Sequence, residues 1–352
     1  MINYLILFFC SLSLGQGPSL PLKPASTQPT TQPIGDPRAV RLLMIEAKAL
    51  EPLVKTDWVK SFLSATRRLP PFPSRTLLRD EKKNVYFNAS QAVTLGDVYR
   101  ETLVLTELAP SFYYYTRYGS PLAYARPLDL LGQRGFTNLP EKKILDFGYG
   151  GVGQLRLLAS LGAVVVGVDV DPLLYALYSD PADQGAIIGE GGTAGSLTLL
   201  YGKYPADQRM VAEVGAGYDL VISKNTLKMG YIHPMRKADK RQLIDLGVDD
   251  AVFVRSIYDI LKPGGYFMVY NLCPAPSPAD KPFVPWSDGR FPFARKVCES
   301  LGFKVLEFQT EDSDAARQMG HALAWDEGKD GMDLKNDLFA SYTLLQKPES
   351  QK

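Results

Sequence analysis

The stretch at residues 143–172 constrains the fold more than any other part of the chain. Residues 144–147 form a short apolar run that stops at glycines, residues 152–161 repeat their leucines at helical spacing, and residues 163–168 are rich in valine. A strand, a glycine turn, a helix and a second strand in this order predict a β-α-β unit, which is the start of a parallel sheet.

Two kinds of ligand compete for the glycine turn. Gly148, Gly150 and Gly153 match G-x-G-x-x-G, and Asp169 lies at the tip of the second strand, where a ribose-binding acid is expected. A dinucleotide requires bare backbone amides at the helix N-terminus, because they bind its pyrophosphate. Asp146 places a carboxylate two residues before the first glycine, where it repels a phosphate and attracts an ammonium or a sulfonium. The pattern favours a cationic nucleoside.

The same stretch resembles the first motif of the class I S-adenosylmethionine-dependent methyltransferases, D-x-G-x-G, with Asp169 as the acid after the second strand. The family usually has a third glycine where this chain has Val152. L-K-P-G-G at residues 261–265, before a strand at 266–272, is also common in that family and uncommon in dehydrogenases. The resemblance covers residues 128–347. It implies an α/β fold with a doubly wound, mostly parallel, seven-stranded Rossmann-like sheet, closed by an antiparallel pair at 303–310 and 338–346.

The resemblance also implies a cofactor, S-adenosyl-L-methionine, and a set of residues that hold it. The candidates at the strand ends and the glycine turn are Asp146, Gly148, Tyr149, Gly150, Gly153, Asp169, Val170 and Ser223. Tyr115 and Tyr118 belong to a tyrosine-rich stretch at 112–125, and such a segment often closes over the cofactor in related enzymes. The alternative is that this stretch only covers the edge of the sheet. Asp171, followed by Pro172, is explained as a helix N-cap.

Three residues at or beyond the carboxyl end of the fourth predicted strand, at 218–227, are candidates for catalysis. Lys224 and Asn225 end that strand at the edge where ligands of open parallel sheets bind. His233, one of two histidines in the chain, could deprotonate a substrate hydroxyl or amine near neutral pH, or be an ordinary loop histidine. The proline-rich loop at 274–292 is long enough to be a substrate lid, with Trp286 and Arg290 lining the acceptor pocket, or else a packed surface loop.

The rest of the chain divides into three further segments. Residues 1–17 are expected to be a signal peptide, because their apolar run is too short to span a bilayer, and residues 18–36 a Pro/Thr-rich tether. If the signal is genuine the protein is exported, to the periplasm or the medium; otherwise it is cytoplasmic. Residues 37–127 are expected to form a helical extension, including a helix at 95–108, before the methyltransferase-like domain at 128–348.

Composition excludes some partners and leaves three functions open. The 39 Lys and Arg residues balance 38 Asp and Glu without a basic block, so no nucleic-acid partner is expected. The sequence has no cluster of metal ligands, and no metal is expected. The favoured function is methyl transfer to an oxygen or nitrogen of a small or exposed substrate. The alternatives are an NAD-dependent oxidoreductase and a non-catalytic, exported methyltransferase-like domain.

Overall fold

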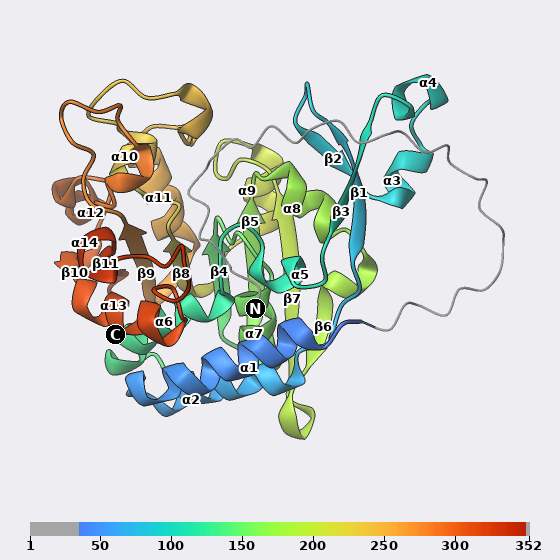
Figure 1. Ribbon diagram of the computed structural model, residues 1–352. Coiled ribbons are helices and arrows are strands. Elements are labelled where there is room, and N and C mark those ends of the chain that lie inside the picture. The colour runs from blue at the N-terminus through green and yellow to red at the C-terminus, as the bar shows by residue number, and fades with distance from the viewer. Residues whose placement is uncertain (1–34, 350–352) are drawn as a thin grey trace.

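A sheet of eight strands forms the centre of the protein, of which the computed structural model describes residues 35–349 (Figure 1). β4 (Lys143–Phe147) lies in the middle and pairs in parallel with β5 (Val164–Asp169) and β8 (Tyr218–Lys224). β7 (Ala194–Tyr201) and β9 (Leu261–Cys273) extend the parallel part on either side. Because the first strand of the series is central, the chain winds outwards in both directions, as a doubly wound sheet does.

The two edges of the sheet are antiparallel, and one of them differs from the prediction. β11 (Phe339–Gln346) pairs antiparallel with both β9 and β10 (Lys304–Glu311), which agrees with the predicted closing pair. At the other edge, β6 (Gly185–Ile188) pairs antiparallel with β7. The prediction of seven strands was wrong, because the glycine-rich residues around β6 have little strand propensity of their own and become a strand by pairing with the edge of β7.

Helices cover both faces of the sheet, and alternate residues of each strand enter two separate cores. Ile144 belongs to the core under α7 (Gly153–Ser160), and Leu145 to the core under α11 (Asp250–Ile260). The first core also receives side chains from α6 (Ala125–Gln133), α8 (Pro172–Leu177) and α13 (Ser313–Ala322). The second receives them from α9 (Gln208–Val214) and α12 (Arg295–Ser300). Burial on both faces explains why the central strands are apolar throughout.

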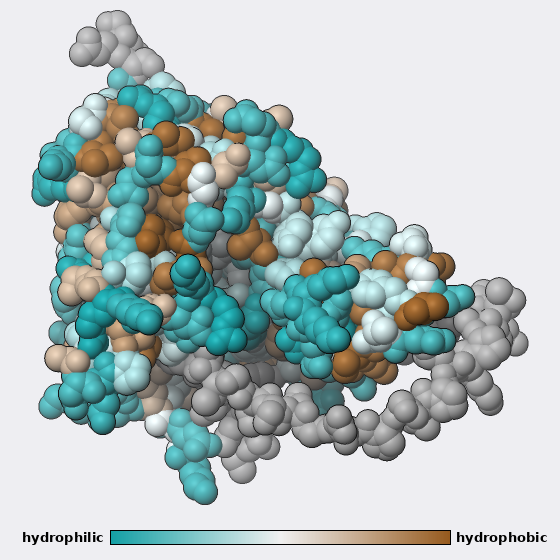
Figure 2. Space-filling model, turned by 90° about the horizontal axis from the view of Figure 1, so that it is seen from above, coloured by the Kyte–Doolittle hydropathy of each residue, from teal (hydrophilic) through white to brown (hydrophobic). Residues whose placement is uncertain are grey.

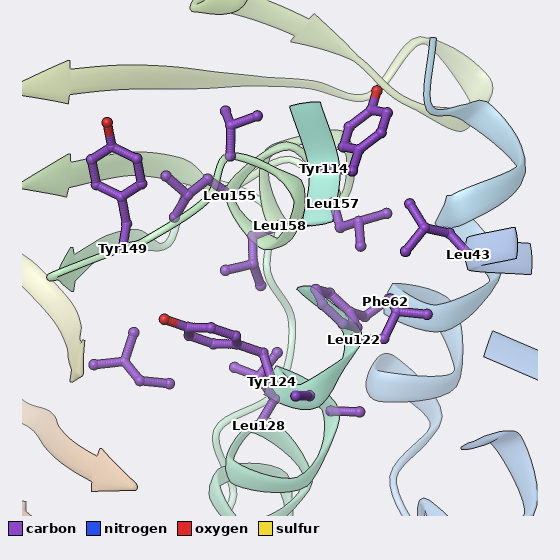
Figure 3. Packing of buried hydrophobic residues seen from close by; sticks show 14 of the residues in the cluster. Leu43, Phe62, Tyr114, Leu122, Tyr124, Leu128, Tyr149, Leu155, Leu157 and Leu158 are labelled. Carbon is purple, nitrogen blue, oxygen red and sulfur yellow. The ribbon is translucent and has the colours of Figure 1, made fainter. Parts of the chain in front are cut away.

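Two N-terminal helices belong to the first of these cores. Leu43 of α1 (Arg38–Leu50) and Phe62 of α2 (Asp57–Ser64) pack in one cluster with Leu157 of α7 (Figure 3). All three side chains are fully buried. The N-terminal helices are therefore joined to the sheet domain by shared apolar burial, which is the main stabilising term in such contacts.

The region before the sheet domain is only partly helical, which corrects the prediction of a helix at 95–108. β1 (Arg75–Asp80) pairs antiparallel with β2 (Val85–Phe87) and with β3 (Val104–Leu108), and only α4 (Asp97–Arg100) of the predicted helix is helical. Helical spacing of apolar residues was misleading here, because β3 obtains its hydrogen bonds from β1, about 25 to 33 residues earlier in the chain.

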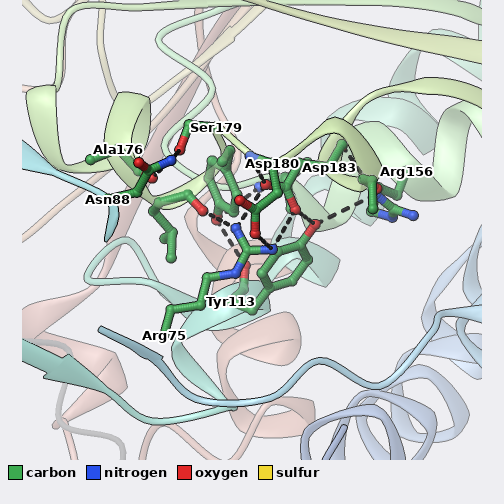
Figure 4. Close-up of polar contacts among 12 residues, drawn as sticks. Arg75, Asn88, Tyr113, Arg156, Ala176, Ser179, Asp180 and Asp183 are labelled. Atoms are coloured by element: carbon green, nitrogen blue, oxygen red, sulfur yellow. Dashed lines mark hydrogen bonds and ion pairs between the residues drawn. The ribbon is translucent and has the colours of Figure 1, made fainter. Parts of the chain in front are cut away.

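A buried ionic cluster fastens this small sheet to the main one (Figure 4). The Arg75 guanidinium donates to both carboxylate oxygens of Asp183 at 2.7 Å, and the Tyr113 hydroxyl donates to Asp183 at 2.9 Å. Arg156 of α7 donates to the Asp183 backbone carbonyl at 3.1 Å. Asp183 is fully buried, so its charge depends on these partners.

The remaining elements are single turns. The short helices are α3 (Ala89–Val93), α5 (Phe112–Tyr115), α10 (Met229–Ile232) and α14 (Leu334–Asp337). The 3₁₀ turns are η1 (Glu51–Leu53), η2 (Ala65–Arg68), η3 (Pro121–Tyr124), η4 (Pro181–Asp183), η5 (Glu190–Gly192), η6 (Lys240–Gln242) and η7 (Pro285–Ser287). None of the helices within residues 35–349 is long and apolar enough to cross a bilayer. The expected signal peptide at 1–17, and the tether up to residue 34, lie outside the described residues.

Candidate functional site

The carboxyl ends of β4, β5 and β8 meet at one edge of the sheet, and the predicted site residues follow them. Asp146, Asp169 and Lys224 stand at these three ends and on one face, because each is an even number of residues from a side chain of the first core. Seen from above, the molecule is hollowed between the part that carries α10 and α12 and the part that carries β1–β3 (Figure 2). The edge that binds ligands in open parallel sheets thus carries two acids and a base.

Asp146 is fully buried and holds two hydrogen bonds. Its Oδ1 accepts from the Tyr124 hydroxyl at 3.0 Å, and its Oδ2 accepts from Nε2 of Gln154 at 3.1 Å. Burial raises the pKa of Asp146 to about 7, although both hydrogen bonds and the charge of Lys224 act in the opposite direction. The carboxyl group can therefore change its charge near neutral pH.

Asp169 is held by backbone amides on both of its oxygens. Oδ2 accepts from the amide of Gly150 at 3.1 Å, and Oδ1 accepts from the amides of Val170 and Asp171 at 2.7 and 2.9 Å. Burial, followed by the nearby charge of Asp171, raises the pKa of Asp169 to about 6. The charge of Asp169 contributes, after burial, to the raised pKa of Asp146. The Val170 side chain itself is exposed.

The glycine turn owes its shape to close contacts within the protein. Gly148 has a φ of +72°, and a Cβ there would lie 2.2 Å from Oγ1 of Thr226. Gly150 has a φ of +62° and lies under the ring of Tyr118. A Cβ at Gly153 would lie 2.6 Å from Cγ of Pro121. Gly148 and Gly150 are thus favoured by both backbone conformation and packing, and Gly153 by packing alone.

The amides of this turn are already engaged. Gly150 N–H donates to Asp169, Gly151 N–H donates to the carbonyl of Tyr149 at 2.6 Å, and Val152 N–H donates to the hydroxyl of Tyr178 at 3.3 Å. The Tyr149 side chain turns inwards and packs against Gly167 and the ring of Tyr178. A dinucleotide would bind its pyrophosphate through amides of this turn and of the first turn of α7, and three of these amides have partners inside the protein.

The two tyrosines predicted from the tyrosine-rich stretch lie in different places. Tyr118 is 46% exposed and packs on Gly150, and its hydroxyl donates to Asp171 at 2.9 Å. Arg117 also pairs with Asp171, which in addition caps α8 through the amide of Leu173. Tyr115 is buried, and its hydroxyl interacts with Glu46 of α1. The structure therefore places Tyr118, and not Tyr115, against the glycine turn.

The end of β8 contributes one base and two structural residues. Burial lowers the pKa of Lys224 to about 8, against the opposing effect of Asp146, and its ammonium lies 5.4 Å from the ring centre of Tyr124. Ser223 is buried, and its hydroxyl donates to the carbonyl of Phe147 at 2.9 Å. Asn225 has a φ of +65°, and its Oδ1 accepts from the amide of Leu272 at 2.7 Å. These contacts hold the neighbouring strand ends together.

His233 and the long loop lie beside this edge. The Nε2 of His233 is 2.9 Å from Oδ1 of Asp250 at the start of α11, and the side chain is largely exposed. Arg290 is exposed and paired with Asp288, and Trp286 is partly buried in η7. Within residues 35–349, the His233 side chain hydrogen-bonds to Asp250 of α11 and to neither acid of the site.

Sequence reasoning missed Tyr124 and Gln154, which hold Asp146, and Lys228, which lies beyond Lys224. Gln154 could have been found, because it falls in the first turn of the helix that follows the glycines. Tyr124 had no signal beyond its place in a tyrosine-rich stretch. Among residues 35–349, no group of three or more His, Cys, Asp and Glu side chains could hold a metal ion. A cavity of about 180 Å³ between η1, α6 and α13 is lined by none of the site residues.

The strand order decides the fold. The series β7-β5-β4-β8-β9 runs in parallel and is followed by the reversed strand β11 and then β10, with a glycine turn and two acids at the central strand ends. The chain has the class I methyltransferase fold. β6 is an addition at the edge of this methyltransferase sheet.

Comparisons with known proteins found similar solved structures of low sequence identity. No protein-family model and no curated protein sequence matches the chain. Among solved structures, a putative sarcosine dimethylglycine methyltransferase from Galdieria sulphuraria is 16% identical, with 67% of this chain and 88% of that chain covered and a TM-score of 0.37. Phosphoethanolamine N-methyltransferase 2 of Haemonchus contortus, in complex with S-adenosylhomocysteine, is 14% identical (70% and 63% covered, TM-score 0.39). The [4+2]-cyclase SpnF is 18% identical (64% and 81% covered, TM-score 0.36). Such similarities describe the fold alone.

Proposed function

We propose that the protein is an S-adenosylmethionine-dependent methyltransferase that acts on an oxygen or nitrogen of a small or exposed substrate. One observation carries the proposal: the carboxyl groups of Asp146 and Asp169 stand beside the glycine turn, and three of its amides already have partners inside the protein. Such a site repels a pyrophosphate and favours a nucleoside with positive charge. The same observation disfavours the NAD-dependent alternative.

The residues present fit this cofactor. Asp169 is held in a fixed position by three amides, and its Oδ2, which accepts from the Gly150 amide alone, can still accept from a ribose hydroxyl. Asp146 with Gln154 offers an acceptor and a carbonyl to an ammonium group, and the ring of Tyr118 offers an aromatic face to a cation. Bound there, S-adenosylmethionine would supply an electrophilic methyl group carried by a sulfonium.

The residues of this chain then have to align the acceptor and take up its proton. Lys224 is the base that we favour, because a lysine whose pKa is about 8 is partly neutral near physiological pH. Asn225 holds the end of β8 to β9, and so positions Lys224. His233 stays a candidate base from the sequence. Methyl transfer needs mainly alignment and exclusion of water, and Tyr118 and the loop at 274–292 are placed to exclude water.

Calorimetric titration of the full chain with S-adenosylhomocysteine and with NAD⁺ tests the proposal. We expect S-adenosylhomocysteine to bind and NAD⁺ not to bind. Tighter binding of NAD⁺ would favour an oxidoreductase. Failure of both ligands to bind, with a native circular dichroism spectrum, would leave the non-catalytic alternative.

A further inference from the structure

Residues 116–119 lie directly on the glycine turn. The Thr116 hydroxyl donates to the carbonyl of Gly150 at 2.9 Å. A Cβ at Gly150 would lie 3.0 Å from the ring of Tyr118, and a Cβ at Gly151 would lie 3.5 Å from the side chain of Thr116. The shape of the turn therefore depends on where residues 116–119 are held.

The backbone of this segment has an unfavourable conformation at its start and open space at its end. Thr116 has a φ of +42° and a ψ of −166°, which a β-branched residue rarely adopts. Gly119 has a φ of +83°, and a Cβ there would meet nothing within 4 Å. A strained backbone of this kind persists only where neighbouring groups impose it. Contacts outside residues 116–119 must therefore hold the segment in place.

The two residues that flank the segment both reach Glu46 of α1. The Ser120 hydroxyl donates to Oε2 of Glu46 at 2.6 Å, and the Tyr115 hydroxyl also interacts with this carboxyl group. Ser120 and Tyr115 are buried, so water competes little for either hydroxyl. A carboxylate has two oxygens and can accept from two hydroxyls at once. Glu46 thus joins the start and the end of the segment to one point on α1.

The tip of the segment is held separately, by the sheet domain. The Tyr118 hydroxyl donates to Asp171 at 2.9 Å, and Arg117 pairs with the same carboxylate. The segment is therefore fixed at its tip from the start of α8 and at its base from α1. The base contact acts on the backbone on both sides of the strained residue, Thr116. Its loss would let that backbone relax, and the packing on Gly150 would relax with it.

We propose that Glu46 is a positioning residue for the cofactor, because its carboxylate holds residues 116–119 against the glycine turn. The helix α1 is then part of the S-adenosylmethionine site. This inference rests on the proposed methyltransferase function. The competing explanation is structural: Glu46 would only fasten α1 to η3, and Ser120, whose hydroxyl oxygen accepts from the amide of Leu122 at 3.2 Å, would only cap η3.

The first experiment titrates the full chain with S-adenosylhomocysteine by calorimetry, at a temperature at which every variant is folded by circular dichroism. Glu46→Ala should weaken binding by roughly 3- to 30-fold, the range expected of a residue that acts on a site without touching its ligand. Glu46→Gln keeps one oxygen that can accept from Ser120, so it should lose less affinity than Glu46→Ala does. Glu51→Ala, which removes an exposed glutamate directly after α1, is the matched control and should bind as the wild type does.

Hydrogen exchange without cofactor, followed by mass spectrometry, reports on the segment itself. In Glu46→Ala, the amides of residues 116–120 and 148–153 should exchange faster than in the wild type, while those of β8 should keep their rates. Equal acceleration in β8 would mean a general loss of stability and would overturn the proposal. Unchanged exchange at 148–153 would overturn it as well, because the glycine turn would then not depend on Glu46.

Ser120→Ala and its combination with Glu46→Ala complete the test. If Ser120 acts through Glu46, the double variant should lose less affinity for S-adenosylhomocysteine than the sum of the two single losses. Losses that add would mean that Ser120 acts only as a cap, and would overturn the proposed link. A wild type that binds S-adenosylhomocysteine, with Glu46→Ala equal to it, would overturn this inference alone. A wild type that does not bind it would overturn the proposed function, and the positioning role with it.

Discussion

The two acids of the site differ in how their oxygens are held. Asp146 is bound by side chains, Tyr124 and Gln154, whereas Asp169 is bound by three backbone amides. Backbone amides are fixed by the strand and the glycine turn, so Asp169 has a more rigid position. Rigid placement suits a group that must hold a ribose hydroxyl in one position.

Asp169→Asn should weaken the binding of S-adenosylhomocysteine by roughly 10- to 100-fold, because hydrogen bonds to a charged group contribute about 1.5–3 kcal/mol. Calorimetric titration checks this. Asp259→Asn, on α11 and away from the site, is the control and should bind as the wild type does. Unchanged binding in Asp169→Asn would remove Asp169 from the cofactor site.

The pKa values of Asp146 and Asp169 are raised to about 7 and about 6, and they determine how pH changes the stability of the fold. An exposed aspartate has a pKa of about 3.9, so between that pH and about 7 the folded protein holds more protons than the unfolded chain. The stability contributed by these two groups is therefore present at low pH and is lost as the pH rises through about 6 to 7.

Binding of S-adenosylhomocysteine should show the opposite trend, because its ammonium group would face Asp146 and requires the ionised carboxyl. The affinity for S-adenosylhomocysteine should increase as the pH rises from about 5 to about 7.5, and binding at pH near 6 should release protons. Titrations in buffers of different ionisation enthalpy measure that release. Asp146→Asn should reduce it, and a release unchanged in that variant would exclude Asp146 as its source.

At the scale of elements, the segment from α5 to η3 packs against the glycine turn and helps to fix its shape. Pro121 of η3 packs on Gly153, and Tyr118 packs on Gly150. Gly153→Ala should destabilise the protein by about 1–3 kcal/mol, because its Cβ would lie 2.6 Å from Cγ of Pro121. Gly96→Ala is the control: nothing lies within 4 Å of a Cβ there, and the change should stay within about 0.5 kcal/mol. Urea unfolding measures both, and equal effects would contradict the packing role.

A second prediction at this scale concerns the contact between Arg75 and Asp183, which attaches the small sheet β2-β1-β3. Arg75→Met leaves the buried charge of Asp183 without its main partner and removes a cation over the ring of Tyr113, so it should cost about 3–5 kcal/mol in urea unfolding. Arg67→Met, at an exposed arginine of η2, should have little effect. Adding Asp183→Asn to Arg75→Met should recover part of the loss. No recovery would mean that packing, and not charge, is responsible.

At the scale of the whole molecule, the N-terminal helices and the sheet domain share one core, although the division at residue 128 stays a prediction. Leu43 and Phe62 pack with residues of α7, so the two parts should unfold together. A variant that keeps Trp58 of α2 as its only tryptophan, with Trp286 and Trp325 replaced by phenylalanine, reports on the first part. Its fluorescence and circular dichroism should give one urea midpoint. A fluorescence change at lower urea would show that the extension unfolds separately.

The sequence by itself determined the local units of this protein. The β-α-β unit around the glycine turn and the Asp171 cap follow from periodicity, glycine conformations and capping, which act over a few residues. The antiparallel closing pair was expected from the family resemblance, and the structure has it. Only the tertiary structure showed that β3 and β6 are strands, because an edge strand obtains its hydrogen bonds from a partner elsewhere in the chain. It also decided which side chains meet the acids. Tyr124 lies 22 residues before Asp146, and the carbonyl that holds Lys228 lies 44 residues after it. The local sequence pattern does not predict such pairs, since they form only when separate segments of the chain pack together.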